Sequence, residues 1–302
     1  MRLYALDSAL GPEGPAFQQP QGTEKASQQP LDHAMYPLLT PRHTSPPSDL
    51  NMSLTAVVLG STGAVGSAVV SALASNPSWS TIYVVVRSAP STPHPSPKVK
   101  PIVVPMPSAG CSADDLLALT STLKPQLPSQ SSATFCLIGV GAPSKGSGSN
   151  LLHVDVDLSS ALIAAAPAKH LSLLTAIDAA RGVKKPMQSK ISPLPFARAG
   201  GPLYNFCKGA IETACLALPF SSRSFFQPAT LLGTPNTPSS WAWLAPKLDW
   251  MLPPAYKSSD IHVLSRSMVK DAEQKVAAPG ADGGDKVFEG KELHALYAEV
   301  KE

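Results

Sequence analysis

The sequence predicts an α/β fold, a doubly wound parallel sheet with helices on both faces and a small C-terminal lobe. Two observations favour this class. From residue 55 onward, short β-branched or apolar runs alternate with segments whose apolar residues recur at helical spacing. A glycine-rich turn joins the first predicted strand to the first predicted helix. Such alternation is typical of βαβ units, whose ligands bind at the carboxyl ends of the strands.

The elements follow in order from this pattern. The first strand is predicted at residues 55–59, and the helix after it has Val65, Ala68, Val69, Ala72 and Leu73 at helical spacing. Further strands are predicted at residues 81–86, 102–104, 133–138, 171–175 and 223–226. Further helices are predicted at residues 113–123, 154–166 and 204–218. Beyond residue 227 the pattern loosens, and helices at 241–252, 265–276 and 289–297 are expected to form a substrate lobe packed on the sheet.

Residues 1–52 differ in composition from the rest of the chain. They are rich in Pro, Gln and Ser without a sustained apolar period, so a disordered leader is expected before a folded region at 53–302. The leader has no continuous apolar stretch of the secretory kind and carries more acids than a mitochondrial presequence. Met52 directly precedes the first strand, which suggests the hypothesis that the folded protein begins there.

Composition excludes some functions and disfavours others. The net charge of +3 comes with no sharp basic run, which argues against nucleic acid as the primary partner. No apolar run reaches the ~18 residues of a membrane span, so a soluble, cytoplasmic protein is expected. The four cysteines lack metal-ligand spacing and are interpreted as small buried hydrophobes in a reducing compartment. His153, His170 and His262 are isolated and are interpreted as structural, so no metal is predicted.

The turn after the first strand contains the pattern G-x-x-G-x-x-G at Gly60, Gly63 and Gly66. Glycines allow a tight turn and let a pyrophosphate approach the backbone, while the first helical amides point at that anion. In its strand–helix context the pattern predicts a dinucleotide cofactor. The alternative is an ordinary βα turn made of small residues.

The end of the second strand indicates which dinucleotide is bound. Arg87 follows that strand where this architecture meets the adenosine ribose. An acid there would favour NAD, whereas a cation suits a 2′-phosphate, so NADPH is favoured over NADH. The alternative is a solvated arginine at a strand end.

Two further features indicate the reactive end of the cofactor. Gly139 follows the strand at 133–138, where a small residue would let the nicotinamide ribose lie against the backbone; it could also simply turn the chain. Tyr204 and Lys208 are four residues apart and share one helix face. An adjacent ammonium is expected to lower the pKa of the Tyr204 phenol, which could then exchange a proton with a substrate carbonyl or alcohol.

Together the segments GSTGAVG, VVVR, FCLIG, VDVD, LSLLTA, YNFCKGAIE and QPATLLG resemble an atypical short-chain dehydrogenase/reductase. More narrowly, they resemble the Tat-interacting protein group and its fungal relatives on the mitochondrial outer membrane. The resemblance covers residues 54–300 and implies a Rossmann-like domain, NADPH binding and a Tyr204–Lys208 pair. It also implies cofactor contacts at Gly60, Ser61, Thr62, Gly63, Val65 and Arg87. Peripheral attachment to the mitochondrial outer membrane is implied in the same way.

The sequence departs from this family at three places. Two serines are usual after the fifth strand, where this chain has Thr175 and Ala176, so Thr175 is the remaining candidate to polarise a carbonyl. The interval 177–203 is longer than usual and is interpreted as a lid, a partner-binding loop or a solvated insertion. Arg-Pro-Gly after the sixth strand is replaced by Gln227-Pro228-Ala229.

Two functions follow. The first is an NADPH-dependent oxidoreductase acting on a carbonyl or alcohol of a small-molecule substrate, with Tyr204, Lys208 and Thr175 as catalytic residues. The second is a dinucleotide-binding regulatory or scaffold protein with little or no catalysis and with a protein partner. The scaffold hosts both kinds of protein, so the fold does not decide between them.

Overall fold

A parallel sheet of seven strands runs through the part of the chain that the computed structural model describes, residues 53–140, 148–184, 201–235, 237, 239–278 and 284–301. The strand order is β3-β2-β1-β4-β5-β6-β9. The strands are β1 (Leu54–Leu59), β2 (Trp79–Val86), β3 (Val99–Val103), β4 (Ser131–Cys136), β5 (Ala168–Leu174), β6 (Ser222–Phe226) and β9 (Lys286–Phe288). This is the doubly wound arrangement that the alternating pattern predicts.

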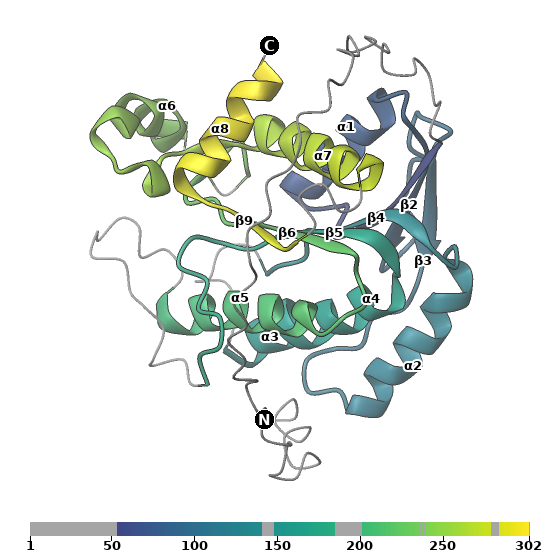
Figure 1. The fold of residues 1–302 in the computed structure, drawn as a ribbon. Helices are drawn as coiled ribbons and strands as arrows, with labels where there is room; N and C mark the ends of the chain where they lie inside the picture. Colours follow the sequence, from purple (N-terminus) through teal and green to yellow (C-terminus); the bar gives the residue numbers. More distant parts are fainter. Residues whose placement is uncertain are drawn as a thin grey trace, which may run out of the picture. The chain divides into compact units, whose positions relative to one another are not determined.

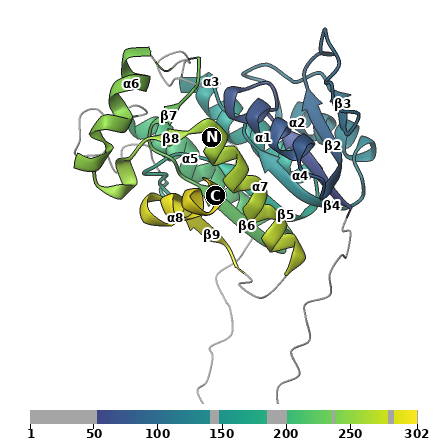
Figure 2. The same cartoon turned by 90° about the horizontal axis from the view of Figure 1, so that it is seen from above.

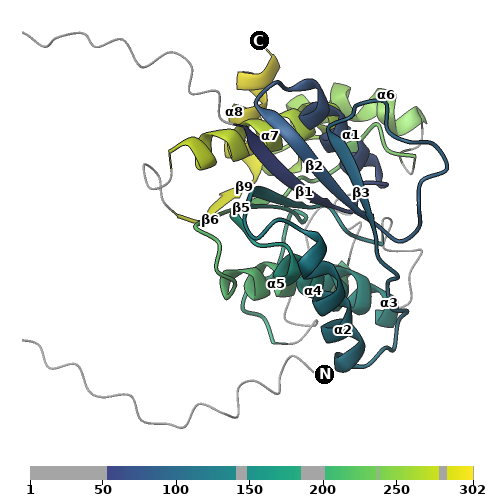
Figure 3. The same ribbon diagram turned by 90° about the vertical axis from the view of Figure 1, so that its right-hand side faces the viewer.

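Helices cover both faces of the sheet (Figures 1 and 3). One layer contains α1 (Ala64–Ser75), α7 (Ile261–Ala277) and α8 (Gly290–Lys301); the other contains α2 (Ala113–Leu123), α3 (Gly148–Leu152), α4 (Ser159–Ala165) and α5 (Gly201–Leu216). Each layer buries its own apolar cluster against the sheet. Leu73 of α1 and Met268 of α7 belong to the first cluster, and Leu162 of α4 and Ile211 of α5 belong to the second.

The strand order reverses between β1 and β4, the kind of position at which doubly wound folds bind ligands. β1 pairs with β2 on one side and with β4 on the other, with Leu59 opposite Val85 and Cys136. The chain leaves β1 toward one layer and β4 toward the other. The carboxyl ends of these two strands are therefore the expected position of a ligand.

Local sequence explains where helices begin. Ser112 caps α2 through a reciprocal capping box with Asp115, whose side chain accepts hydrogen bonds from the Ser112 amide and hydroxyl. The carboxylate of Asp260 accepts hydrogen bonds from two amides at the start of α7. These caps satisfy amides that have no partner within the helix.

A small group of elements lies between β6 and α7, outside the large sheet (Figure 2). It comprises β7 (Leu231–Leu232), α6 (Ser239–Leu248), the 3₁₀ helices η7 (Asp249–Met251) and η8 (Pro254–Tyr256), and β8 (Ser259–Asp260), which pairs with β7. The side chains of Trp243 and Trp250 are 64% and 79% exposed, and Met251 beside them is also exposed. An apolar surface therefore lies on α6 and η7.

The structure corrects several predicted boundaries. The helix predicted at 241–252 ends at Leu248 and continues as η7, while β4 begins and ends two residues earlier than predicted. The helix predicted at 154–166 is two elements, a π-helix η4 (His153–Leu158) followed by α4. Strand β9 was not predicted; it pairs with β6, and the ring of its Phe288 stacks on that of Phe226 with 4.8 Å between the ring centres. The leader at 1–52 and residues 185–200 of the interval 177–203 lie outside the described residues.

No helix within the described ranges is both long and apolar enough to cross a bilayer.

Candidate functional site

The turn between β1 and α1 is built so closely that two of its glycines admit no side chain. Gly60 has a φ of 86°, and a Cβ there would lie 2.8 Å from the carbonyl carbon of Leu137, just beyond β4. A Cβ on Gly66 would lie 2.0 Å from the carbonyl oxygen of Gly60. The first glycine therefore brings the turn against β4, and the other packs α1 onto the turn.

The N-terminus of α1 lies directly after this turn, at the carboxyl end of β1. Gly63 is the N-cap in an extended conformation, no side chain caps the helix, and no acid lies in its first turn. Thr62 and Gly63 are exposed, Ser61 is half-buried and Val65 is buried. The first helical amides and the helix dipole are thus available to an anion, as the glycine pattern predicts.

Arg87 directly follows β2, which is adjacent to β1 in the sheet, and its side chain is exposed. No ion pair joins Arg87 to another residue in the part of the chain that the structure describes. Because parallel strands end at the same edge, Arg87 lies on the same side of the sheet as the glycine turn.

Beyond β4, the structure brings together Gly139, Lys208 and Asp155, an acid that was not among the predicted site residues. The Nζ of Lys208 on α5 lies 2.6 Å from Oδ1 of Asp155 in η4, and both side chains are buried. The other carboxylate oxygen of Asp155 accepts a hydrogen bond of 3.2 Å from the Val140 amide. A Cβ on Gly139 would lie 3.4 Å from both the Lys208 nitrogen and the Asp155 oxygen, so the ion pair sits directly against this glycine.

Tyr204 lies one turn before Lys208 on α5, as the i, i+4 spacing predicts. The Lys208 nitrogen is 5.5 Å from the centre of the Tyr204 ring. Burial raises the pKa of the Tyr204 phenol; Lys208 opposes this change, whereas Asp155 adds to it. The expectation of a lowered phenol pKa is therefore wrong for this structure, because burial and Asp155 together outweigh the ammonium.

Lys208 is protonated in the folded protein. Burial alone would lower the pKa of Lys208, but Tyr204 and Asp155 outweigh burial and raise it well above its ordinary value. The side chain therefore remains an ammonium, with one N–H directed to Asp155 and two further N–H groups that can donate.

Thr175, just after β5, is buried and its hydroxyl donates a hydrogen bond of 2.5 Å to Oε1 of Glu212. The fully buried Glu212 carboxylate also accepts hydrogen bonds from the Gln227 side chain, at 2.8 and 3.1 Å, and from Nε of Arg181. One carboxylate thus joins the ends of β5 and β6 to α5. In this arrangement the Thr175 hydroxyl donates to Glu212.

Asp155 and Glu212 were not predicted from the sequence. Glu212 had a signal, since Tyr204, Lys208 and Glu212 follow at intervals of four and share one face of α5. Asp155 and Asp157 look equivalent in sequence, and only the π-helical turn makes the first buried and leaves the second partly exposed. Within the described residues, no group of three or more His, Cys, Asp or Glu side chains could hold a metal ion.

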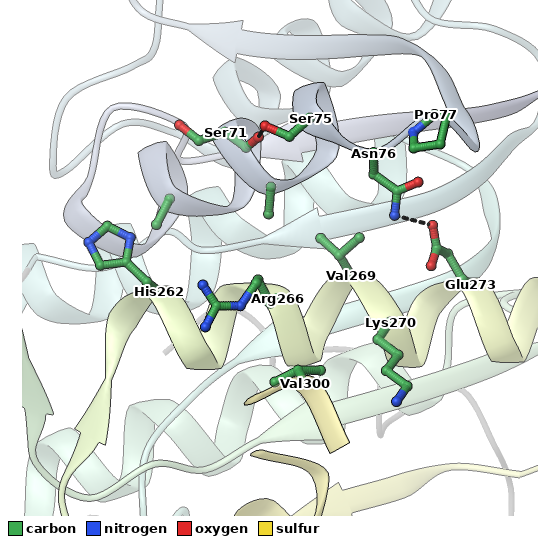
Figure 4. A pocket seen from close by; sticks show the side chains of 12 residues that line it. Ser71, Ser75, Asn76, Pro77, His262, Arg266, Val269, Lys270, Glu273 and Val300 are labelled. Atoms are coloured by element: carbon green, nitrogen blue, oxygen red, sulfur yellow. Dashed lines mark hydrogen bonds between the residues drawn. The ribbon is translucent and has the colours of Figure 1, made fainter. Parts of the chain in front are cut away.

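A separate cavity of about 530 Å³ lies between α1 and α7 (Figure 4). His262 and Arg266 of α7 line it, and at its other end Nδ2 of Asn76 donates a hydrogen bond of 2.7 Å to Glu273. The residues that line this cavity include none of the predicted cofactor or catalytic residues.

No protein-family model and no curated protein matches the sequence. Solved structures of similar fold include a short-chain dehydrogenase/reductase from Serratia marcescens, with 16% identity, a TM-score of 0.51, and 80% of this chain and 99% of that chain covered. The UDP-glucuronic acid 4-epimerase from Bacillus cereus in complex with NAD has 14% identity and a TM-score of 0.50, with 79% and 78% covered. The Bordetella bronchiseptica enzyme WbmH in complex with NAD⁺ has 16% identity and a TM-score of 0.50, with 82% and 81% covered. The chain therefore has the Rossmann-like α/β fold of these structures.

Proposed function

We propose that this chain is an NADPH-dependent oxidoreductase of the short-chain dehydrogenase/reductase type, acting on a carbonyl or alcohol of a small-molecule substrate. One observation carries the proposal. Two features lie at the carboxyl ends of adjacent strands. The uncapped N-terminus of α1 and its glycine turn follow β1, and the buried Lys208–Asp155 pair lies against Gly139 beyond β4. These are the two places where the halves of a dinucleotide would bind in a doubly wound sheet.

The described residues fit a dinucleotide. The turn from Gly60 to Gly66 would hold the diphosphate against its backbone amides. The cofactor contacts in this turn would be Gly60, Ser61, Thr62, Gly63, Val65 and Gly66. Arg87 would bind the 2′-phosphate of the adenosine ribose. Lys208 would donate to the nicotinamide ribose from a position next to Gly139, because Asp155 occupies only one of its three N–H groups.

The bound dinucleotide would supply or accept a hydride at the substrate carbon. Tyr204 would then give its phenolic proton to the carbonyl oxygen, or take the proton of an alcohol. Lys208 would favour the tyrosinate that remains, and Asp155 would hold the ammonium in place. Thr175 would polarise the carbonyl only after its hydroxyl turns away from Glu212.

Titration with NADPH and NADH tests the cofactor. The full chain should bind NADPH more tightly than NADH, and Arg87→Ala should weaken NADPH binding by about tenfold, the size of one lost charge-assisted hydrogen bond. NADH affinity should not change in this variant, since NADH lacks the 2′-phosphate. Absence of binding by either nucleotide would overturn the proposal.

Turnover tests the catalytic assignment. With NADPH and a panel of carbonyl compounds, Tyr204→Phe should reduce the rate by roughly 10²- to 10⁴-fold, the usual contribution of a general acid. Tyr83→Phe, a half-buried tyrosine on β2, is the matched control and should keep the wild-type rate. Equal rates for the wild type and Tyr204→Phe would remove Tyr204 from the mechanism.

A dinucleotide-binding regulatory or scaffold protein is the second candidate function. Three observations favour it: Ala176 provides no donor, the Thr175 hydroxyl donates to Glu212, and burial raises the pKa of Tyr204. The exposed Trp243 and Trp250 on α6 and η7 provide a surface for a protein partner. Micromolar dinucleotide affinity without turnover, together with a partner whose binding depends on NADPH, would support this function over the first.

We also propose that β7, α6, η7, η8 and β8, at the start of the lobe predicted from about residue 227, form the substrate lobe, and that the protein is cytoplasmic. The later elements α7, β9 and α8 belong to the large sheet and its helix layer. Peripheral attachment to the mitochondrial outer membrane rests on the family resemblance alone. Fractionation of cells that express the full chain tests it, since a peripheral protein leaves the membrane pellet in alkaline carbonate whereas a cytosolic protein is never in that pellet.

A further inference from the structure

A cysteine and a histidine that take no part in the proposed site face each other beside η4. The sulfur of Cys111 lies 3.9 Å from Nδ1 of His153. Cys111 is partly exposed and closes a tight turn in which its amide donates to the Ser108 carbonyl. His153, the first residue of η4, is only 6% exposed. A buried imidazole is thus directed at a thiol that solvent can reach.

The second ring nitrogen of His153 determines what the first can do. Nε2 lies 3.0 Å from the carbonyl oxygen of Pro107, which can only accept a hydrogen bond. Nε2 therefore carries a proton, and the nitrogen that faces Cys111 has two states. It is either an acceptor for the thiol S–H or, once protonated, the partner of a thiolate. This is the arrangement by which a histidine activates a cysteine.

The charges around the pair act in both directions. Cys111 immediately precedes Ser112, the N-cap of α2, so it lies at the positive end of that helix. Asp157, one turn along from His153, interacts electrostatically with the imidazole. Asp114 and Asp115 in the first turn of α2 oppose a thiolate, although Asp115 is hydrogen-bonded to Ser112.

We propose that Cys111 and His153 form a reactive thiol site that forms a mixed disulfide with small disulfide compounds. The Cys111 thiolate attacks one sulfur of the disulfide, the new S–S bond forms and the old one breaks. The leaving thiolate departs with the electron pair and receives the proton held at Nδ1 of His153. Cys111 is oxidised and the released half of the disulfide is reduced to a thiol, so the disulfide itself is the oxidant.

The other cysteines provide the background against which this reaction is measured. Cys136, Cys207 and Cys215 are buried. Burial raises the pKa of Cys136 to about 11 and that of Cys207 to about 12, and also raises that of Cys215. In the folded chain these thiols are protonated and shielded, so a disulfide reagent should modify Cys111 alone.

The first experiment treats the full, folded chain with oxidised glutathione and maps the adduct by mass spectrometry. One adduct per chain at Cys111 is expected, and Cys111→Ser should abolish it. The rate of reaction followed against pH should have its midpoint at least one unit below the ordinary thiol value of ~8.5. A midpoint at or above that value, or an adduct on another cysteine, would overturn the proposal.

The second experiment varies the partners of the thiol. His153→Gln should move the pH midpoint up by about one unit and slow the reaction at pH 7 by about threefold, since part of the gain in thiolate is offset by weaker nucleophilicity. Asp157→Asn should move the midpoint in the same direction by less. His262→Gln, a change at an exposed histidine of α7, is the matched control and should leave the profile unchanged. If His153→Gln does not fold, the pH–rate profiles of the wild type and Asp157→Asn test the proposal. An unchanged midpoint in Asp157→Asn would then contradict activation of Cys111 by His153.

Discussion

Lys208 and Asp155 form a buried ion pair, with 2.6 Å between the ammonium nitrogen and a carboxylate oxygen. The pair connects α5, which carries Tyr204, to the π-helix η4 on the same side of the sheet. Because each charge is removed from water, each depends on the other for compensation. The contact therefore controls both the position of Lys208 and the cost of burying it.

Asp155→Asn should destabilise the protein by about 3–5 kcal/mol, the usual effect of leaving one charge of a buried pair without its partner. Urea unfolding at pH 7 measures this. Asp157→Asn, two residues along on the same element and partly exposed, is the control and should change the free energy of unfolding by less than about 1 kcal/mol. Equal effects of the two substitutions would show that Asp155 does not compensate Lys208.

Gly66→Ala should lower the melting temperature, because the added Cβ would lie 2.0 Å from the Gly60 carbonyl oxygen and α1 would have to move. Overpacking of this kind costs about 1–3 kcal/mol. Gly63→Ala is the comparison: its Cβ would have an ordinary contact of 3.5 Å with the same oxygen, and its φ of −73° suits any residue. If thermal unfolding showed the two variants to be equally stable, the close packing of α1 on the turn would be refuted.

Glu212→Ala should destabilise the protein by about 3 kcal/mol or more, since the donors of Thr175, Arg181 and Gln227 lose their common acceptor. Chemical denaturation measures the change. Leu216→Ala, on the next turn of α5 at a position 41% exposed, should cost much less. A small effect of Glu212→Ala would mean that the ends of β5 and β6 are held together without this carboxylate.

The stability of the protein should fall as the pH is lowered from about 6.5 toward 3 because of His170. This side chain is fully buried, donates to or accepts from the Ser222 hydroxyl at 2.9 Å, and lies 3.6 Å from Asp271. Burial, with Lys275 adding to it, lowers the pKa of His170 to about 3. In that window the unfolded chain binds a proton that the folded chain does not, so each pH unit removes up to about 1.4 kcal/mol.

Asp271 acts with the opposite sign, because burial raises its pKa and its folded form binds a proton more readily. His170→Gln should therefore flatten the decline in stability between pH 6.5 and 5, and Asp271→Asn should steepen it below pH 5. Urea titrations at several pH values measure both slopes. A wild-type slope unchanged by His170→Gln would exclude His170 as its source.

The fold could be predicted from the sequence because its signals are local. The runs in β1 and β2 and the glycine turn are continuous in the chain, and α2 was predicted at its observed ends, Ala113–Leu123. Strand β9 could not be found in this way, because Lys286–Phe288 begins with a lysine and has only two apolar residues, and its strand character comes from pairing with β6. The π-helix was missed for a similar reason: its extra residue per turn does not change the apolar pattern enough to be seen.

For the candidate site, the sequence contains only what single residues and regular spacing can indicate. Tyr204 and Lys208 were found by helical periodicity, but their electrostatics depend on Asp155, which is some 50 residues earlier and is brought to Lys208 only by the packing of η4 on α5. Burial, which dominates the pKa of Tyr204, is likewise a property of the packed chain. The role of Glu212 required the ends of two strands to be placed beside α5, and no local pattern contains that information.

The π-helix η4 positions two side chains, that of His153, its first residue, and that of Asp155 two residues later. If η4 couples the two sites, thermodynamic linkage requires that nucleotide binding at Lys208 and protonation of Cys111 affect each other equally. If a nucleotide that saturates Lys208 shifts the pKa of Cys111, the same coupling must change the nucleotide affinity. The pKa shift equals the logarithm of the ratio between the nucleotide affinities of the protein with Cys111 protonated and with Cys111 deprotonated. A pH titration of the Cys111 thiol with and without nucleotide, and nucleotide binding measured against pH, would then give the same coupling free energy.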